Sequence, residues 1–133
     1  MPVFAPPPIG MFALRVGDFA DDRLSQAIVI VAWGDLTEYE PVGCARVSFS
    51  GDMGPRHALY YGYYGNRLTT DPSDGVVLAL NGPTESAHSV EATVAGNVAS
   101  SEEHVFVAGS THIIFVFYDK ETYPQNPTPS WCQ

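Results

Sequence analysis

The chain has 133 residues, a length typical of one domain, and its 15 acidic against 6 basic side chains give a formal net charge of -9. Six scattered cations do not supply the basic face that phosphate binding requires, so the composition argues against direct nucleic-acid binding and against an anionic membrane surface. No apolar run approaches the roughly 18 residues of a membrane span, and the N-terminus lacks the basic and apolar regions of a secretory signal. We therefore expect a soluble protein that is made in a cytoplasm.

Charged residues make up only 16% of the chain, whereas the average for soluble domains is about 25%. A monomer of this size needs charged side chains to keep its surface hydrated and free of apolar patches. The scarcity of charge therefore predicts that a partner covers part of the surface.

The first elements in chain order are an arm and two strands. Residues 1–10 are rich in proline, which lacks an N–H and resists regular structure, so we expect an extended N-terminal arm. Residues 11–16 predict the first strand. Residues 28–33 (Ile-Val-Ile-Val-Ala-Trp) are apolar throughout, and because a strand with one hydrated face alternates, this run predicts a strand buried on both faces.

The middle of the chain predicts shorter strands separated by turns. Residues 36–41 read as a polar loop, and residues 42–50 then alternate between apolar and polar side chains, as a half-buried strand does. Residues 57–64 predict a strand rich in tyrosine, residues 76–80 another apolar strand, and residues 89–94 a further alternating one.

The last third of the chain predicts a polar loop followed by a hairpin. The loop covers residues 96–103. Strands at residues 104–108 and 111–118 are joined through Gly109 and Ser110, a spacing that favours a two-residue hairpin. From residue 113 onward the second of these strands is again apolar on both faces.

Together these elements predict a single all-β domain over residues 1–133, with a core at 11–120 between the arm at 1–10 and a proline-rich C-terminal arm at 121–133. About eight strands at this turn spacing favour a two-sheet antiparallel sandwich, jelly-roll-like in its connections. A closed β-barrel is the second choice.

The two cysteines are too few for a disulfide scaffold. We expect free thiols, with Cys44 in a strand and Cys132 in the C-terminal arm. One disulfide between them remains an open alternative.

No motif points to a metal, a cofactor or a catalytic group. The four histidines lack the spacing of a zinc site, and the aspartates of residues 71–74 are more typical of a turn than of a calcium loop. The sequence has neither a nucleophile elbow nor a phosphate-binding glycine loop. We therefore assign no catalytic residue, no metal ligand and no cofactor.

Two sets of residues are candidates for a surface site. Aromatic side chains give large contact areas at low entropic cost, so tyrosines on a strand indicate an interface, although β-propensity alone also explains them. The predicted interface set is Ile28, Ile30, Trp33, Tyr61, Tyr63, Ile113, Phe115, Phe117 and Trp131. An alternative ligand-binding set is Tyr60, Tyr64, Asn66, Asp71 and Asp74.

These features favour a non-enzymatic structural protein that assembles with copies of itself, and with other structural proteins, into a particle. A virion capsid, decoration or tail component is the architectural analogy, and a trimer or another cyclic homo-oligomer is the expected unit. The first alternative is a lectin-like module that binds a glycan or a protein. The second is a small β-barrel cyclase or isomerase, which would need His57 or His112 beside a carboxylate in a pocket.

Overall fold

The computed structural model describes residues 22–50, 58–60, 69–84 and 86–132. The predicted N-terminal arm and the predicted strand at 11–16 lie outside these ranges. The described part contains strands and one short 3-10 turn at Ser130–Cys132. The strands are β1 (Ser25–Gly34), β2 (Tyr39–Pro41), β3 (Arg46–Phe49), β4 (Ala58–Tyr60), β5 (Val76–Gly82), β6 (Ser86–His88), β7 (Val90–Val94), β8 (Asn97–Ser100), β9 (His104–Phe106) and β10 (Thr111–Tyr118).

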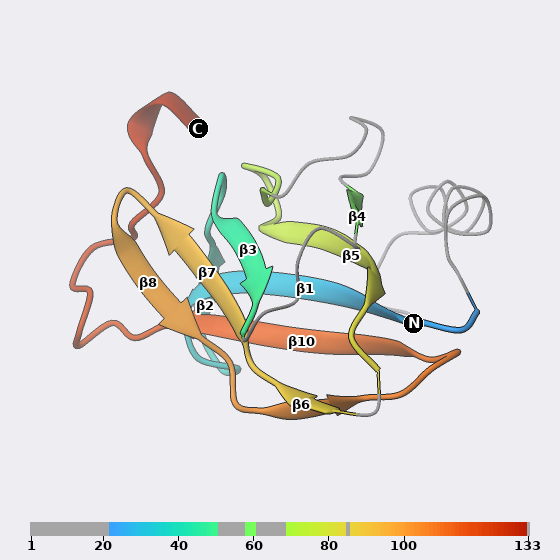
Figure 1. The fold of residues 1–133 in the computed structure, drawn as a ribbon. Helices are drawn as coiled ribbons and strands as arrows, with labels where there is room; N and C mark the ends of the chain where they lie inside the picture. Colours follow the sequence, from blue (N-terminus) through green and yellow to red (C-terminus); the bar gives the residue numbers. More distant parts are fainter. Residues whose placement is uncertain (1–21, 51–57, 61–68, 85, 133) are drawn as a thin grey trace.

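The strands form an all-β sandwich, as the sequence predicts. The larger sheet is five-stranded, with the order β10-β1-β5-β4 and with β2 paired to β1 beyond the end of β5. A three-stranded sheet, β3-β7-β8, lies across β1 and β10, and β6 and β9 form a separate two-stranded ribbon (Figure 1). No closed barrel is found in the described part of the chain.

β1 and β10, the pair at one edge of the larger sheet, are parallel, whereas every other strand pair among the described residues is antiparallel. β1 and β10 run in register over eight residues, from Gln26 beside Thr111 to Trp33 beside Tyr118. A parallel pair needs a long connection that returns the chain to its starting end. Here all the strands from β2 to β9 lie in that connection.

Three local expectations were wrong. β9 pairs with β6 and not with β10, so Gly109 and Ser110 do not close a hairpin. The predicted loop at 96–103 contains β8, because Ala95 (φ 49°) and Gly96 (φ 83°) make a tight turn from β7 that lacks the usual Asn-Gly signal. The predicted loop at 36–41 contains the short edge strand β2.

Side chains alternate along β1, and both of its faces are buried. Val29 and Val31 are fully buried in the main core between the two large sheets. On the opposite face Ile28 is buried against Leu78 and Leu80 of β5. The prediction that this strand is covered on both sides is therefore confirmed for most of its length.

Tyr118 joins the two sheets through its hydroxyl group. Its ring is fully buried at the end of β10, and the hydroxyl lies 2.8 Å from the carbonyl oxygen of Asn97 and 3.1 Å from that of Ala92, both in the second sheet. Burial, and secondarily the neighbouring Tyr123, raises the pKa of Tyr118 well above its ordinary value. The hydroxyl therefore stays a hydrogen-bond donor throughout the usual pH range.

Replacing Tyr118 with phenylalanine removes the buried hydroxyl that lies within hydrogen-bond distance of the Ala92 and Asn97 carbonyls. We expect Tyr118→Phe to lower the free energy of unfolding by about 1–2 kcal/mol, measured by urea denaturation. Tyr39→Phe, at an exposed tyrosine of the same sheet, is the matched control and should change stability by less than about 0.5 kcal/mol. Equal effects of the two substitutions would contradict this role for the Tyr118 hydroxyl.

Candidate functional site

The outward face of β10 is apolar and accessible. Strand alternation directs the even-numbered side chains into the core, and the odd-numbered Ile113, Phe115 and Phe117 away from it. Ile113 is 42% exposed, and the rings of Phe115 and Phe117 are half-buried and stacked, with centroids 5.6 Å apart. Tyr39 of β2 adds an exposed ring at 6.4 Å from Phe117. We call these four residues the β10 face.

Charged side chains lie just beyond the C-terminal end of this face. A shallow hollow of about 640 Å³ there is lined by Gly34, Asp35, Phe117, Asp119, Lys120 and Glu121. The ammonium of Lys120 is 2.9 Å from a Glu38 oxygen and 5.1 Å from the ring centroid of Trp33. Glu38 raises the pKa of Lys120, so the cation persists, and the ammonium lies over the indole ring. The apolar strand β10 is therefore followed by the ion pair between Lys120 and Glu38.

The predicted interface residues of β1 pack against other parts of their own subunit. Ile28 is buried and Ile30 half-buried against β5. Trp33 packs on the main core, and its indole N–H donates to the carbonyl of Tyr123 at 2.6 Å. Of the predicted set, Ile113 and Trp131 are exposed, and Phe115 and Phe117 are half-buried with their rings directed away from the core. Tyr61 and Tyr63 lie outside the described residues.

The cysteines are not free thiols, contrary to expectation: Cys44 and Cys132 form a disulfide with their Cα atoms 6.2 Å apart. Cys44 breaks the predicted strand at 42–50 because it adopts φ 57°, so that the regular strand β3 begins only at Arg46. Thr70 holds this bend, since its carbonyl accepts the Cys44 N–H and its hydroxyl accepts the Ala45 N–H. Residues 88 positions apart meet through this bend, and no sequence spacing signals the pairing.

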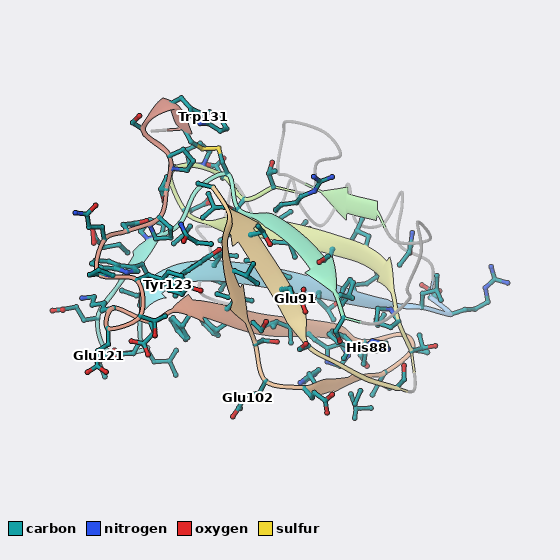
Figure 2. The ribbon with its side chains drawn as sticks, turned by 60° about the vertical axis from the view of Figure 1, so that its left-hand side comes forward. His88, Glu91, Glu102, Glu121, Tyr123 and Trp131 are labelled. Atoms are coloured by element: carbon teal, nitrogen blue, oxygen red, sulfur yellow. A yellow bond between two sulfur atoms is a disulfide. The ribbon has the colours of Figure 1, made fainter. Side chains whose placement is uncertain are left out.

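The C-terminal segment therefore lies on its own subunit. The Gly43 N–H donates to the Thr128 hydroxyl at 3.1 Å, and the Asn126 amide donates to the Pro41 carbonyl at 3.3 Å. Trp131, next to the disulfide, remains 79% exposed at the tip of this segment (Figure 2). The disulfide thus anchors the turn at Ser130–Cys132, on which the large apolar side chain of Trp131 is exposed.

The alternative ligand set is only partly placed. Asp71 accepts a hydrogen bond from the Ser73 N–H at 2.7 Å, and Asp74 accepts one from the Val76 N–H at 3.1 Å, so both carboxylates stabilise the turn before β5. Burial, with a smaller contribution from Asp71, raises the pKa of Asp74. Tyr60 lies on β4, whose side chains are not described. Tyr64 and Asn66 lie outside the described residues.

Two histidines that the sequence did not connect form a hydrogen-bonded pair. His104 Nε2 lies 2.8 Å from His112 Nδ1, and the Val107 N–H donates to His112 Nε2 at 3.1 Å. Because Nε2 of His112 accepts, its Nδ1 carries the proton and donates to His104. The pair packs against the buried ring of Phe106. In this arrangement one ring nitrogen of His112 contacts His104 and the other contacts a backbone N–H, and neither contacts a carboxylate.

Within residues 22–50, 58–60, 69–84 and 86–132, no group of three or more His, Cys, Asp or Glu side chains is placed to hold a metal ion. Nor does this part of the chain contain a helix long and apolar enough to cross a membrane. No protein-family model matches the chain, and neither a curated protein nor a solved structure is detectably similar to it.

The disulfide closes a long loop, so its loss should destabilise the fold. We expect Cys132→Ser to lower the free energy of unfolding by about 2–4 kcal/mol in urea denaturation, because the unfolded chain regains the entropy that the crosslink removes. A thiol reductant is the matched control: it should weaken the native protein by a similar amount and leave Cys132→Ser unchanged. A native protein insensitive to reductant would refute the crosslink.

The histidine pair predicts a loss of stability in weak acid. Burial, and then the neighbouring His104, lowers the pKa of His112 from its ordinary value of 6.5, so the unfolded chain binds its proton more readily than the folded chain does. Stability should therefore be complete above pH 6.5 and fall as the pH drops towards the depressed folded pKa. In urea denaturation from about pH 7.5 to 5.5, His112→Gln should flatten this dependence, whereas Thr111→Val should retain it. An unchanged slope in His112→Gln would contradict the assignment.

Proposed function

We propose that this protein is a non-enzymatic structural subunit that assembles with copies of itself into a larger particle, of the kind formed by virion capsid, decoration or tail components. The observation that carries the proposal is the β10 face. Ile113, Phe115 and Phe117 follow one another along a single strand and point away from the core; Ile113 is exposed, and the two phenylalanines are half-buried.

Isolated exposed apolar side chains are ordinary on monomers, but a contiguous row is typical of an interface. No Asp, Glu, Lys or Arg occurs between Thr111 and Tyr118 to interrupt the row. The low charge of the whole chain, 16% of residues, leaves few side chains to keep such a surface hydrated. Covering the row with another subunit removes these apolar side chains from water, which is favourable.

The disulfide supports a location at the outside of a particle. Disulfides persist in oxidising environments, among them virion and cell surfaces, and are rare in reducing cytosol. A particle surface is an oxidising location of this kind, in which the Cys44–Cys132 bond persists.

A lectin-like or protein-binding module is the second candidate, and one observation favours it. Trp131 is 79% exposed on a turn that the disulfide tethers, and exposed aromatic rings stack on sugars or anchor protein partners. This function requires no self-association, so the two candidates predict different native masses.

The proposed assembly is tested by the native mass, measured by sedimentation velocity across a dilution series. We expect the full chain to form an oligomer, and we expect Ile113→Lys to raise its dissociation constant roughly tenfold or more, because the substitution places an unpaired charge in the interface. Val98→Lys is the matched control: Val98 is 46% exposed on β8, against 42% for Ile113, and its substitution should leave assembly unchanged. A native protein that stays monomeric at high concentration would overturn the proposal and favour the binding module.

A further inference from the structure

β10 is an edge strand of the larger sheet. One of its edges pairs with β1 along the full strand, and among the described residues no strand pairs with the other edge (Figure 1). β9 packs near the beginning of β10 through its contacts with His112, but it pairs only with β6. An unpaired edge presents a row of N–H and C=O groups to any strand that can reach it.

The outward backbone groups belong to the same residues as the outward apolar side chains. The N–H and C=O groups of a strand residue point to one edge, and successive residues point to opposite edges. The Gln26 N–H donates to the Ser110 carbonyl at 2.9 Å, so the even-numbered residues of β10 face β1. The backbone groups of Ile113, Phe115 and Phe117 therefore point to the free edge.

β10 also lacks the devices that normally protect an edge strand. Proteins blunt such edges with charged side chains, proline, bulges or very short strands. β10 is eight residues long, contains no proline, Lys, Arg, Asp or Glu, and keeps a regular register with β1 throughout. The first charged residues, Asp119 and Lys120, follow its end.

We propose that the occupant of this edge is β10 of a second copy, paired antiparallel about a two-fold axis so that the larger sheet continues through both subunits. This inference rests on the proposed self-assembly and specifies its contact. A two-fold axis brings the same strand of each copy together, which satisfies both free edges at once.

The residue pattern fits this pairing. Residues directly opposite each other in an antiparallel pair share a face, so odd-numbered residues of one copy must lie opposite odd-numbered residues of the other. Those are the residues whose backbone groups point outward. The same register aligns Ile113, Phe115 and Phe117 of both copies in one row, where aromatic and aliphatic cross-strand pairs stabilise a sheet.

The charge along β10 does not oppose pairing with a second copy. The chain carries a net charge of -9, so two copies repel wherever their acidic surfaces meet. β10 offers a contact with no acidic side chain along its length. A basic partner would find no carboxylate on this strand to recognise.

Hydrogen–deuterium exchange, resolved by residue and recorded across a dilution series, tests this contact. In the assembled protein we expect the amides of Ile113, Phe115 and Phe117 to exchange at least about tenfold more slowly than in the dilute monomer. The amides of Ile114 and Val116 should be slow in both states, because they face β1. The predicted signature is thus protection that depends on assembly at alternate residues only.

A pair of substitutions at Phe115 gives an independent readout. Phe115→Pro removes the outward N–H, a change that edge strands tolerate, and should shift the native mass to that of the monomer. Phe115→Ile keeps the N–H and an apolar side chain and should remain assembled. Protected amides of Ile114 and Val116 would confirm that the proline variant is folded, and if it does not fold, the exchange series on the native chain decides alone.

Each result has a distinct meaning. An oligomer whose odd-numbered β10 amides exchange rapidly would overturn the edge contact and leave the proposed assembly standing. A chain that is monomeric at every concentration would overturn both proposals. Slow exchange of the odd-numbered amides in the monomer would mean that another segment of the same chain covers the edge, and it would also overturn the contact.

Discussion

The parallel pairing of β1 with β10 is the constraint on which the rest of the structure depends. It joins two of the most apolar segments of the chain, and their inward side chains, such as Val29 and Ile114, meet in the main core. Because both strands run in the same direction, the intervening chain must travel back, and it supplies β5 and the whole second sheet on the way. The same pairing leaves β10 at the edge, with one side of its backbone and one face of its side chains without a described strand beside it.

The disulfide between Cys44 and Cys132 is a second long-range contact, and it fixes the C-terminal segment. It ties the C-terminal segment to the bend at Cys44, and the hydrogen bond from Trp33 to Tyr123 holds the beginning of that segment against β1. The segment is consequently part of the subunit body and does not reach away from it. Among the described residues of this segment, Trp131 is the large apolar side chain that is exposed.

The β1–β10 pairing and the disulfide decide which of the apolar side chains that suggested assembly are buried within the subunit. Both faces of β1 pack within its own subunit, so the apolar residues of this strand are not evidence for a partner. β10 buries only its inner face, and the case for assembly now rests on Ile113, Phe115 and Phe117. In the histidine pair, both ring nitrogens of His112 make internal hydrogen bonds, one with His104 and one with the Val107 N–H.

The sequence by itself determined the all-β class, the positions of β1 and β10 along the chain and the burial of β1, because apolar runs and strand alternation act over a few neighbouring residues. It also marked Phe115 and Phe117 as candidates for an interface. Only the tertiary structure decided that β10 runs parallel to β1, that Cys44 meets Cys132, and that β9 pairs with β6. Strand partners and crosslinks are set by how distant segments pack together, so a pattern within a few neighbouring residues does not predict them. The β7–β8 turn was missed for a different reason: Ala95 adopts a positive φ that its residue type does not advertise.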